Sequence, residues 1–297
     1  MEFLYFLAGL RNDVLDVIIS LLTNIGGEIV CVAAICILFY CIDKKTAYKL
    51  CLTYFVSGLA VKGLKIGFRI QRPWKLDPNF QAVESAKANA SGYSFPSGHT
   101  QSGTALYMGL ALHYKKIWAY IAGLAITLFI MFTRMYLGVH TPKDVLVSFG
   151  VTLVIAFVVS IVYDRFAGSK RANIIIFALI EIISFALIGY SAYIVATGKS
   201  SMEDAMDGFK AAGAGVGFGL GWFVETTWAN FDPKAVKNIW GHILKLVIGL
   251  GVAMLIKSLI KLINPESCFI NIIRYVLTTF WMIGIFPLLI KKFSKSK

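Results

Sequence analysis

A histidine, an aspartate and an arginine lie close together in residues 133–144, within an otherwise apolar part of the chain. Thr141 and Pro142 are typical of a helix start, because Pro suits the first helical position and Thr can cap it. Asp144 then falls at the third helical position, where its carboxylate can accept a hydrogen bond from one ring nitrogen of His140. An imidazole held in this way presents its other nitrogen as a nucleophile or a base.

Arg134 lies six residues before His140 and offers a planar pair of donors to an oxyanion such as phosphate. A capped helix with a surface histidine would explain a lone His near an Asp equally well. Two further polar stretches favour the catalytic interpretation over this structural one.

The first of these stretches is a row of four cations, Lys62, Lys65, Arg69 and Arg72, spaced three, four and three residues apart. This spacing places all four along one face of a helix, near the membrane end of an apolar segment. Extension of the side chains to lipid headgroups could explain one or two of them. Four cations on one face, ending at Arg72-Pro73, indicate a site for an anion.

The second stretch is the tetrapeptide Pro96-Ser97-Gly98-His99. Ser97 can cap the helix that follows, and Gly98 lets the backbone approach a ligand closely. The free N–H groups at such a helix start bind phosphate. His99 would lie at the mouth of the site, where it could protonate a leaving oxygen.

The elements that carry these residues are predicted to be membrane helices. The chain of 297 residues is 58% hydrophobic and only 15% charged, with a mean hydropathy of +0.72, which is typical of a polytopic membrane protein. We expect an all-α transmembrane bundle of about nine spans, preceded by an amphipathic helix over residues 1–24. The expected spans are 27–42, 47–68, 97–113, 117–137, 143–163, 172–195, 204–226, 241–263 and 268–290.

Charge determines the expected orientation of these spans. The formal net charge is +13, and most basic loops fall on one side of the bundle, which the positive-inside rule assigns to the cytoplasm. The ends that carry Arg72, His99 and His140 then face outward from the plasma membrane. Nucleic acid is not an expected partner, because the basic residues are scattered between apolar runs. None of the five cysteines has metal-ligand spacing, so we expect no metal site.

The segment after residue 171 carries few chemical signals. Lys210 lies in an apolar span together with intramembrane acids such as Glu181 and Glu225, and we interpret it as one half of a structural ion pair with a carboxylate. A series of alternating glycines predicts tight packing of the same span against another helix, either within the chain or in a second subunit of a homodimer. These glycines are Gly213, Gly215, Gly217, Gly219 and Gly221.

The polar stretches together resemble the phosphatidic acid phosphatase type 2 family, which shares its site with vanadium haloperoxidases. The resemblance covers roughly residues 50–165, and Thr133 departs from it, because the family usually has Ser there. It implies a catalytic membrane core over residues 1–170 and additional helices over residues 171–297. The matching pattern is Lys65-x6-Arg72-Pro73, Pro96-Ser97-Gly98-His99 and Arg134-x5-His140-x3-Asp144.

This resemblance implies hydrolysis of a phosphate ester through a phosphohistidine, without a metal or other cofactor. His140 would be the nucleophile, Asp144 its orienting partner and His99 the general acid. The phosphoryl oxygens would be held by Lys65, Arg72, Ser97, the Gly98 N–H and Arg134.

The expected substrates are lipid phosphates or polyprenyl pyrophosphates whose tails stay in the bilayer. Three alternatives remain open at this point. The enzyme could pass the phosphoryl group to another acceptor, it could hydrolyse a soluble phosphate ester, or the chain could be a lipid transporter with an inactive site. Intact His99, His140 and Asp144 argue against the last of these.

Overall fold

The computed structural model describes residues 1–88 and 90–294, and within these ranges every regular element is a helix. This agrees with the predicted all-α class. The α-helices are α1 (Glu2–Ala8), α2 (Asp13–Leu22), α3 (Glu28–Ile37), α4 (Lys44–Phe68), α5 (Pro73–Leu76), α6 (Glu84–Lys87), α7 (Gly98–Gly103), α8 (Gly109–Tyr114), α9 (Ile117–Tyr136), α10 (Pro142–Phe166), α11 (Lys170–Ala196), α12 (Met202–Val224), α13 (Ile239–Lys261), α14 (Cys268–Phe280) and α15 (Phe286–Ser294).

Six helical segments of the described chain are long and apolar enough to cross a membrane, and the bent pair Asp13–Gly26 and Glu28–Ile42 would make a seventh. The stretch expected to span at 97–113 is a nearly continuous helix over Gly98–Tyr114, and the stretch at 204–226 overlaps all but the first two residues of α12. Neither passes the same test of length and composition, so the number nine stays a prediction. The six segments are Lys44–Leu76, Ile117–Tyr136, Pro142–Phe166, Lys170–Ala196, Ile239–Lys261 and Cys268–Phe293.

The N-terminal stretch differs from the prediction. In place of one amphipathic helix over residues 1–24, the chain forms α1 and α2, which are separated by a break at residues 9–12. Asn12 causes the new start, because its side chain caps α2 by accepting a hydrogen bond from the Leu15 N–H at 3.0 Å.

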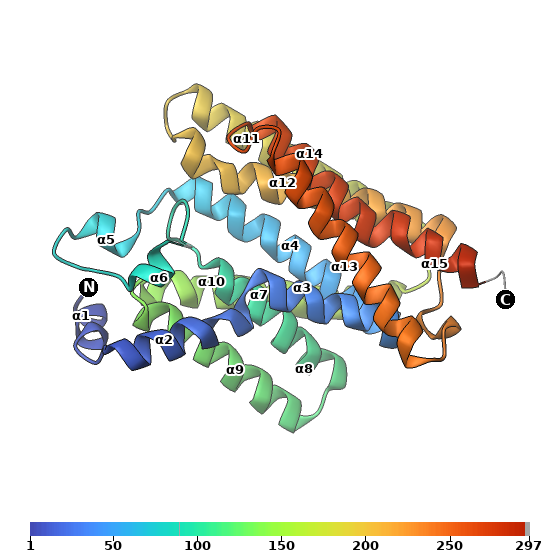
Figure 1. The fold of residues 1–297 in the computed structure, drawn as a ribbon, viewed down its shortest axis with the longest axis horizontal. Coiled ribbons are helices and arrows are strands. Elements are labelled where there is room, and N and C mark those ends of the chain that lie inside the picture. The colour runs from blue at the N-terminus through green and yellow to red at the C-terminus, as the bar shows by residue number, and fades with distance from the viewer. Residues whose placement is uncertain (89, 295–297) are drawn as a thin grey trace.

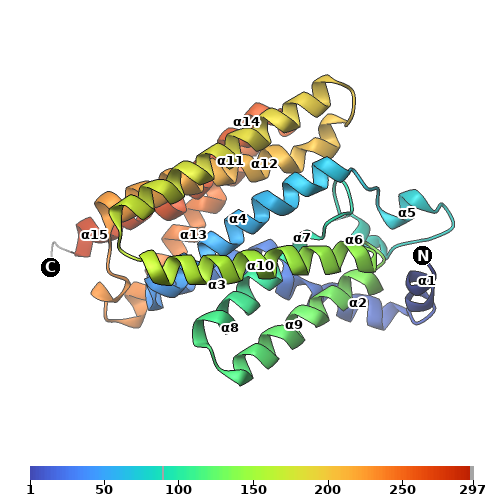
Figure 2. The same cartoon turned by 180° about the vertical axis from the view of Figure 1, so that it is seen from behind.

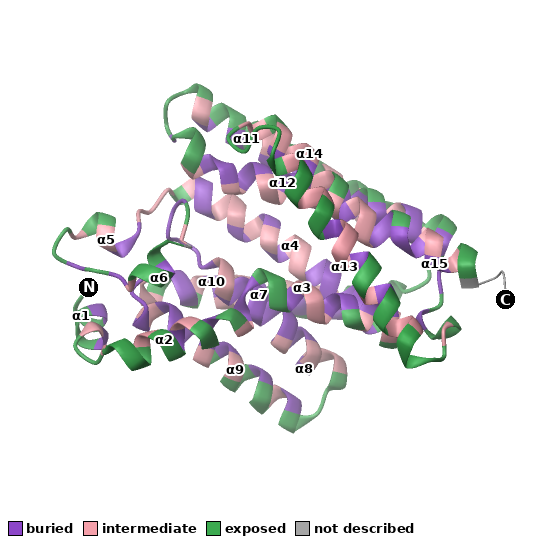
Figure 3. Ribbon diagram, viewed as in Figure 1, coloured by how far each residue is buried: buried purple, intermediate pink, exposed green. Residues whose placement is uncertain are grey.

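Helix α4 lies in the middle of the molecule. In both Figure 1 and Figure 2 it runs between a group formed by α11, α12 and α14 and a group formed by α7 to α10. The buried residues in Figure 3 follow these inward faces, whereas large apolar side chains such as Ile29, Ile182 and Val247 are more than half exposed on outward faces. Such an apolar exterior is what a lipid environment favours.

The glycines of α12 pack as the sequence predicts, and their partners lie in the same chain. A Cβ at Gly213 or Gly217 would collide with the backbone of α14, at Ile272 and Val276 respectively. A Cβ at Gly219 would collide with Glu181 of α11. Gly213 and Gly217 therefore let α12 approach α14 on one face, and Gly219 lets it approach α11 on another.

The predicted ion pair of Lys210 is wrong. Glu225 instead pairs with Lys44 at 3.0 Å, and Glu181 has a buried oxygen without a hydrogen-bond partner. Within the described residues, Lys210 itself has no carboxylate within ion-pair distance. Sequence spacing within one span did not predict this arrangement, because Lys44 is the first residue of α4 and lies 181 residues before Glu225.

Candidate active site

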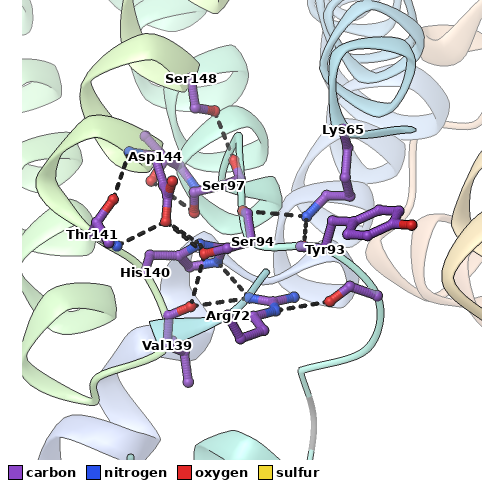
Figure 4. A network of polar contacts seen from close by, with 12 residues as sticks. Lys65, Arg72, Tyr93, Ser94, Ser97, Val139, His140, Thr141, Asp144 and Ser148 are labelled. Carbon is purple, nitrogen blue, oxygen red and sulfur yellow. Dashed lines mark hydrogen bonds and ion pairs between the residues drawn. The ribbon is translucent and has the colours of Figure 1, made fainter. Parts of the chain in front are cut away.

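Three segments distant in sequence meet at one end of the bundle: the end of α4 with the loop after it, the start of α7, and the start of α10. The Ser97 N–H donates to the Asp144 carbonyl at 3.1 Å, and the Ser148 hydroxyl of α10 donates to the Ser97 carbonyl at 2.6 Å. Arg72 joins the loop after α4 to the same place through the Val139 carbonyl, 3.1 Å away. Figure 4 shows the resulting polar network.

The start of α10 places His140 beside Asp144. Thr141 and Asp144 form a reciprocal capping box, in which the Thr141 N–H donates to Asp144 Oδ2 at 2.7 Å, and Pro142 occupies the first turn. The cap holds the carboxylate with Oδ2 3.5 Å from His140 Nδ1, and both side chains are at least 97% buried. The two side chains are therefore placed as the spacing predicts.

Ser94 bridges this pair, and sequence reasoning assigned it no role. Its hydroxyl donates to Asp144 Oδ2 at 2.6 Å and lies 3.3 Å from His140 Nδ1. The Ser94 N–H in turn donates to the Ile70 carbonyl at 2.7 Å, which fixes the loop. The sequence indicated Ser94 only as a small polar residue between Tyr93 and Phe95, two residues before Pro96.

The other ring nitrogen of His140 faces a cation. Arg72 Nη1 lies 3.1 Å from Nε2, and since a guanidinium can only donate, Nε2 must carry the lone pair and Nδ1 the proton. Burial lowers the pKa of His140 well below its ordinary value, and the charges of Arg72, Arg134 and Lys65 lower it further. The geometry thus supplies a neutral imidazole whose free nitrogen points toward positive charge.

Neutral carbonyl groups hold Lys65 and Arg72. Arg72 Nε donates to the Gly92 carbonyl at 3.1 Å and Nη2 to the Ser91 carbonyl at 2.7 Å. Lys65 Nζ donates to the Tyr93 carbonyl at 2.5 Å. Neither cation has a carboxylate within ion-pair distance among the described residues, so their charges are fixed in place without being neutralised.

Arg134 is 96% buried at the end of α9, where its Nη1 donates to the Thr23 hydroxyl at 3.1 Å. Its Nε has no hydrogen-bond partner in the described chain. Thr133, the departure from the family pattern, donates to the same Thr23 oxygen at 2.9 Å. Thr23 lies more than 100 residues away, and nothing in the sequence indicated its role.

The first turn of α7 carries the remaining predicted residues. Ser97 caps it by accepting a hydrogen bond from the Thr100 N–H at 3.4 Å, as expected. A Cβ at Gly98 would meet no atom within 4 Å, so the space beside it is open. The ring of His99 has no hydrogen bond within the described residues, and it interacts electrostatically with Arg134, Arg72, Lys65 and His140.

The predicted row of four cations does not act as one face, because only two of its members reach the candidate site. Lys62 pairs with Asp207 of α12 at 2.6 Å, and Arg69 ends α4 in a left-handed conformation (φ 53°). The spacing rule fails at Arg69 because the helix stops there. Lys65 and Arg72 alone reach the site from this row.

Helix α12 and the turn before it contact the same loop. The Asp207 carboxylate accepts a long hydrogen bond (3.5 Å) from the Ser91 hydroxyl, and the Tyr93 hydroxyl lies 2.9 Å from the Ser200 hydroxyl. Ser91 and Tyr93 are the residues whose carbonyls hold Arg72 and Lys65. The C-terminal helices therefore help to fix the backbone that positions these two cations.

Known proteins that are similar to this chain are named as phosphatases or diphosphatases. Sphingosine-1-phosphate phosphatase 1 of Rattus norvegicus is 26% identical over 199 residues, which is 60% of this chain and 45% of that protein. The Mus musculus protein of the same name matches equally. Undecaprenyl-diphosphatase BcrC of Bacillus subtilis is 30% identical over 164 residues, covering 54% of this chain and 79% of that protein. The chain thus spans about half the length of the two sphingosine-1-phosphate phosphatases. No solved structure matches the chain significantly.

Two family profiles match in succession. One, described as the PAP2 superfamily, matches residues 46–167, and the other, described as the PAP2 superfamily phosphatase, transmembrane extension, matches residues 209–297. The first range contains every predicted site residue, and the second contains α13, α14 and most of α12. Because the bacterial diphosphatase is also matched over most of its own length, the chain belongs to the PAP2 superfamily.

Proposed function

We propose that the protein is a membrane phosphatase that hydrolyses a lipid phosphate or a polyprenyl diphosphate through a phosphohistidine. In this mechanism Nε2 of His140 attacks the phosphorus, and the bond from phosphorus to the leaving oxygen breaks. Burial and the neighbouring cations lower the pKa of His99 to about 3, so its ring takes up the proton that it gives to that oxygen once the negative charge of the phosphoryl group has entered the site. Water then attacks the phosphohistidine and gives one proton back to His99, the bond between Nε2 and phosphorus breaks, and inorganic phosphate and neutral His140 are released.

One observation carries this proposal: Arg72 lies 3.1 Å from Nε2 of a neutral imidazole, Lys65 and Arg134 add positive charge that acts on the same ring, and all three cations are held by uncharged oxygen atoms. Cations fixed by carbonyls and hydroxyls keep their full charge for an incoming phosphoryl group. Its three peripheral oxygens carry the charge of the transition state, which such donors stabilise. A structural role alone would favour carboxylate partners, as Lys62 has in Asp207.

Asp144 and Ser94 complete the chemistry on the far side of the ring. As Nε2 bonds to phosphorus, the imidazole becomes positively charged. The carboxylate near Nδ1 stabilises that charge and holds the tautomer that attacks. The Gly98 N–H and the Ser97 hydroxyl add neutral donors to the phosphate side.

The substrate and the side of the membrane follow from chemistry and charge. A site at the end of membrane helices suits an amphiphile whose tail remains in lipid, and the relatives are named for a sphingoid phosphate and for undecaprenyl diphosphate. The distribution of basic loops supports an active site on the extracytoplasmic side of the plasma membrane. Residues 1–170 would form the catalytic core, and residues 171–297 would support it.

A panel of lipid phosphates and diphosphates in detergent micelles tests the proposal through released phosphate. Wild type should release phosphate from at least one substrate in the presence of EDTA, and His140→Ala should release none. Transfer to an added alcohol without release would identify a phosphotransferase instead. A His140→Ala variant that keeps wild-type turnover would refute the mechanism.

A further inference from the structure

A second group of cations lies outside the candidate active site, between α12 and α14. Arg274 of α14 is 94% buried, and its side chain has no hydrogen bond or ion pair within the described residues. The Arg274 guanidinium lies over the ring of Tyr275, with Arg274 Cζ 5.1 Å from the ring centroid. A ring face attracts a cation but accepts none of the five guanidinium N–H groups in a regular hydrogen bond.

Lys210 of α12 is the neighbour of this arginine. The two helices lie side by side in Figure 1, and Gly213 packs on the backbone of Ile272, close to both cations. Lys210 interacts electrostatically with Arg274 and with Lys62. Two unpaired cations therefore share one face of the contact between α12 and α14.

The acidic groups within reach are already used or exposed. Asp207 is bound to Lys62 at 2.6 Å. Glu28, the other acid that interacts with Lys210, has a side chain 59% exposed and lies 3.7 Å from Lys257. Neither carboxylate is within ion-pair distance of Lys210 or Arg274.

Such an arrangement is costly without a counter-ion. Burying an unpaired charge costs several kcal/mol even after relaxation, and it costs more where lipid surrounds the protein. Two like charges at one place add repulsion to this cost. A planar guanidinium beside an ammonium is the combination that binds phosphate oxygens in proteins.

We propose that Arg274 and Lys210 form a binding site for a phosphate group, carried by an anionic lipid headgroup or free, distinct from the catalytic phosphate site. Both residues lie in the transmembrane extension, which gives this segment a ligand of its own. The Lys62–Asp207 pair interacts with Lys210 and also with Lys65 of the catalytic site. The bound phosphate would therefore stabilise the same helix face that supports the active site. This inference does not depend on the proposed phosphatase activity.

Ligand-dependent thermal unfolding of the purified full chain in neutral detergent tests the site. Phosphatidylglycerol, phosphatidylcholine and inorganic phosphate are added separately, so that a lipid-borne phosphate is distinguished from a free one. We expect phosphatidylglycerol at about 100 times its Kd to raise the Tm by about 5 °C, and phosphatidylcholine to have no such effect. Inorganic phosphate should give the same shift if the free anion suffices, and none if the lipid is required.

The variants Arg274→Gln and Lys210→Gln should each lose most of this shift, whereas Lys261→Gln, at an exposed position at the end of α13, should keep it. Any binding to the catalytic site contributes equally to wild type and variants, so the difference between them reports the new site. If one variant fails to fold, the other gives the comparison. The proposal is overturned if wild type shows no shift with either phosphatidylglycerol or inorganic phosphate, or if both variants keep the wild-type shift.

Discussion

Removing the hydroxyl that bridges His140 and Asp144, the proposed catalytic pair, should slow the chemical step. Ser94 donates to Asp144 at 2.6 Å and lies 3.3 Å from the ring nitrogen of His140 that would become part of a cation during phosphoryl transfer. Ser94→Ala leaves Asp144 with the Thr141 N–H at 2.7 Å but without its hydroxyl donor. The carboxylate then loses the contact that fixes its distance to the imidazole.

The size of the effect follows from the kind of hydrogen bond. A hydrogen bond to a charged group contributes about 1.5–3 kcal/mol, and each 1.36 kcal/mol on the barrier is tenfold in rate. We therefore expect kcat to fall about 10- to 150-fold. KM should change little, because Ser94 Oγ contacts Asp144 and the Nδ1 side of the His140 ring, and not the three cations that would hold phosphate.

The assay is steady-state release of phosphate from the best lipid substrate in micelles, with Ser191→Ala as the matched control. Ser191 is likewise fully buried, and its hydroxyl donates to a backbone carbonyl, that of Leu187, at 2.7 Å within α11. The control should keep wild-type kcat. A loss in Ser94→Ala smaller than threefold, or a rise in KM at constant kcat, would refute the assignment of Ser94 to the nucleophile.

Three further predictions concern charge, support and packing. Because burial and neighbouring cations lower the pKa of His140, its ring should remain neutral as the pH falls through 6.5; a 15N titration that shows protonation of His140 at or above 6.5 would contradict this. Asp207→Asn should raise KM about tenfold, because it releases Lys62 and the loop that holds Arg72. Asp207→Glu keeps the carboxylate and should restore the wild-type KM. Equal KM values in all three proteins would show that α12 does not support the site. Gly217→Ala should destabilise the protein by about 1–3 kcal/mol in thermal unfolding, because the added Cβ meets the Val276 backbone. Gly189→Ala, whose Cβ would meet open space, should not destabilise it. Equal stabilities of the two variants would mean that α12 and α14 are less tightly packed.

Local patterns in the sequence predicted the parts of the site that are built within one turn of a helix. The cap at Thr141, the place of Asp144 and the cap at Ser97 all depend on residues within four positions of one another. The chain fixes such geometry as soon as the helix starts. The glycine faces of α12 were predictable for the same reason, since a spacing of four residues is a local property of a helix.

Contacts between distant segments were not predictable in this way. Thr23 accepts a hydrogen bond from Arg134, which lies more than 100 residues later in the sequence. Lys62 of the predicted row of cations forms an ion pair with Asp207 of α12. Both pairings depend on how the helices pack against one another, which the sequence of a single span does not indicate. The same holds for Lys210, whose expected carboxylate partner binds another cation in the fold.

The different partners of the cations explain how one helix can carry both structure and chemistry. On α4, Lys62 is neutralised by a carboxylate of α12. Among the residues that the structure describes, Lys65, one turn further on, is bound only by the carbonyls of Tyr93 and Ser94. A carboxylate partner lowers the cost of burial and removes charge from the site; carbonyl partners lower part of that cost and leave the charge in place. The loop that supplies those carbonyls is itself bound to Ser200 and Asp207 of the C-terminal half. The stability given up by leaving Lys65 and Arg72 without counter-ions among the described residues is thus offset by these contacts with the turn before α12 and with α12 itself. Under the proposed function, a phosphoryl group entering the site would provide the missing negative charge.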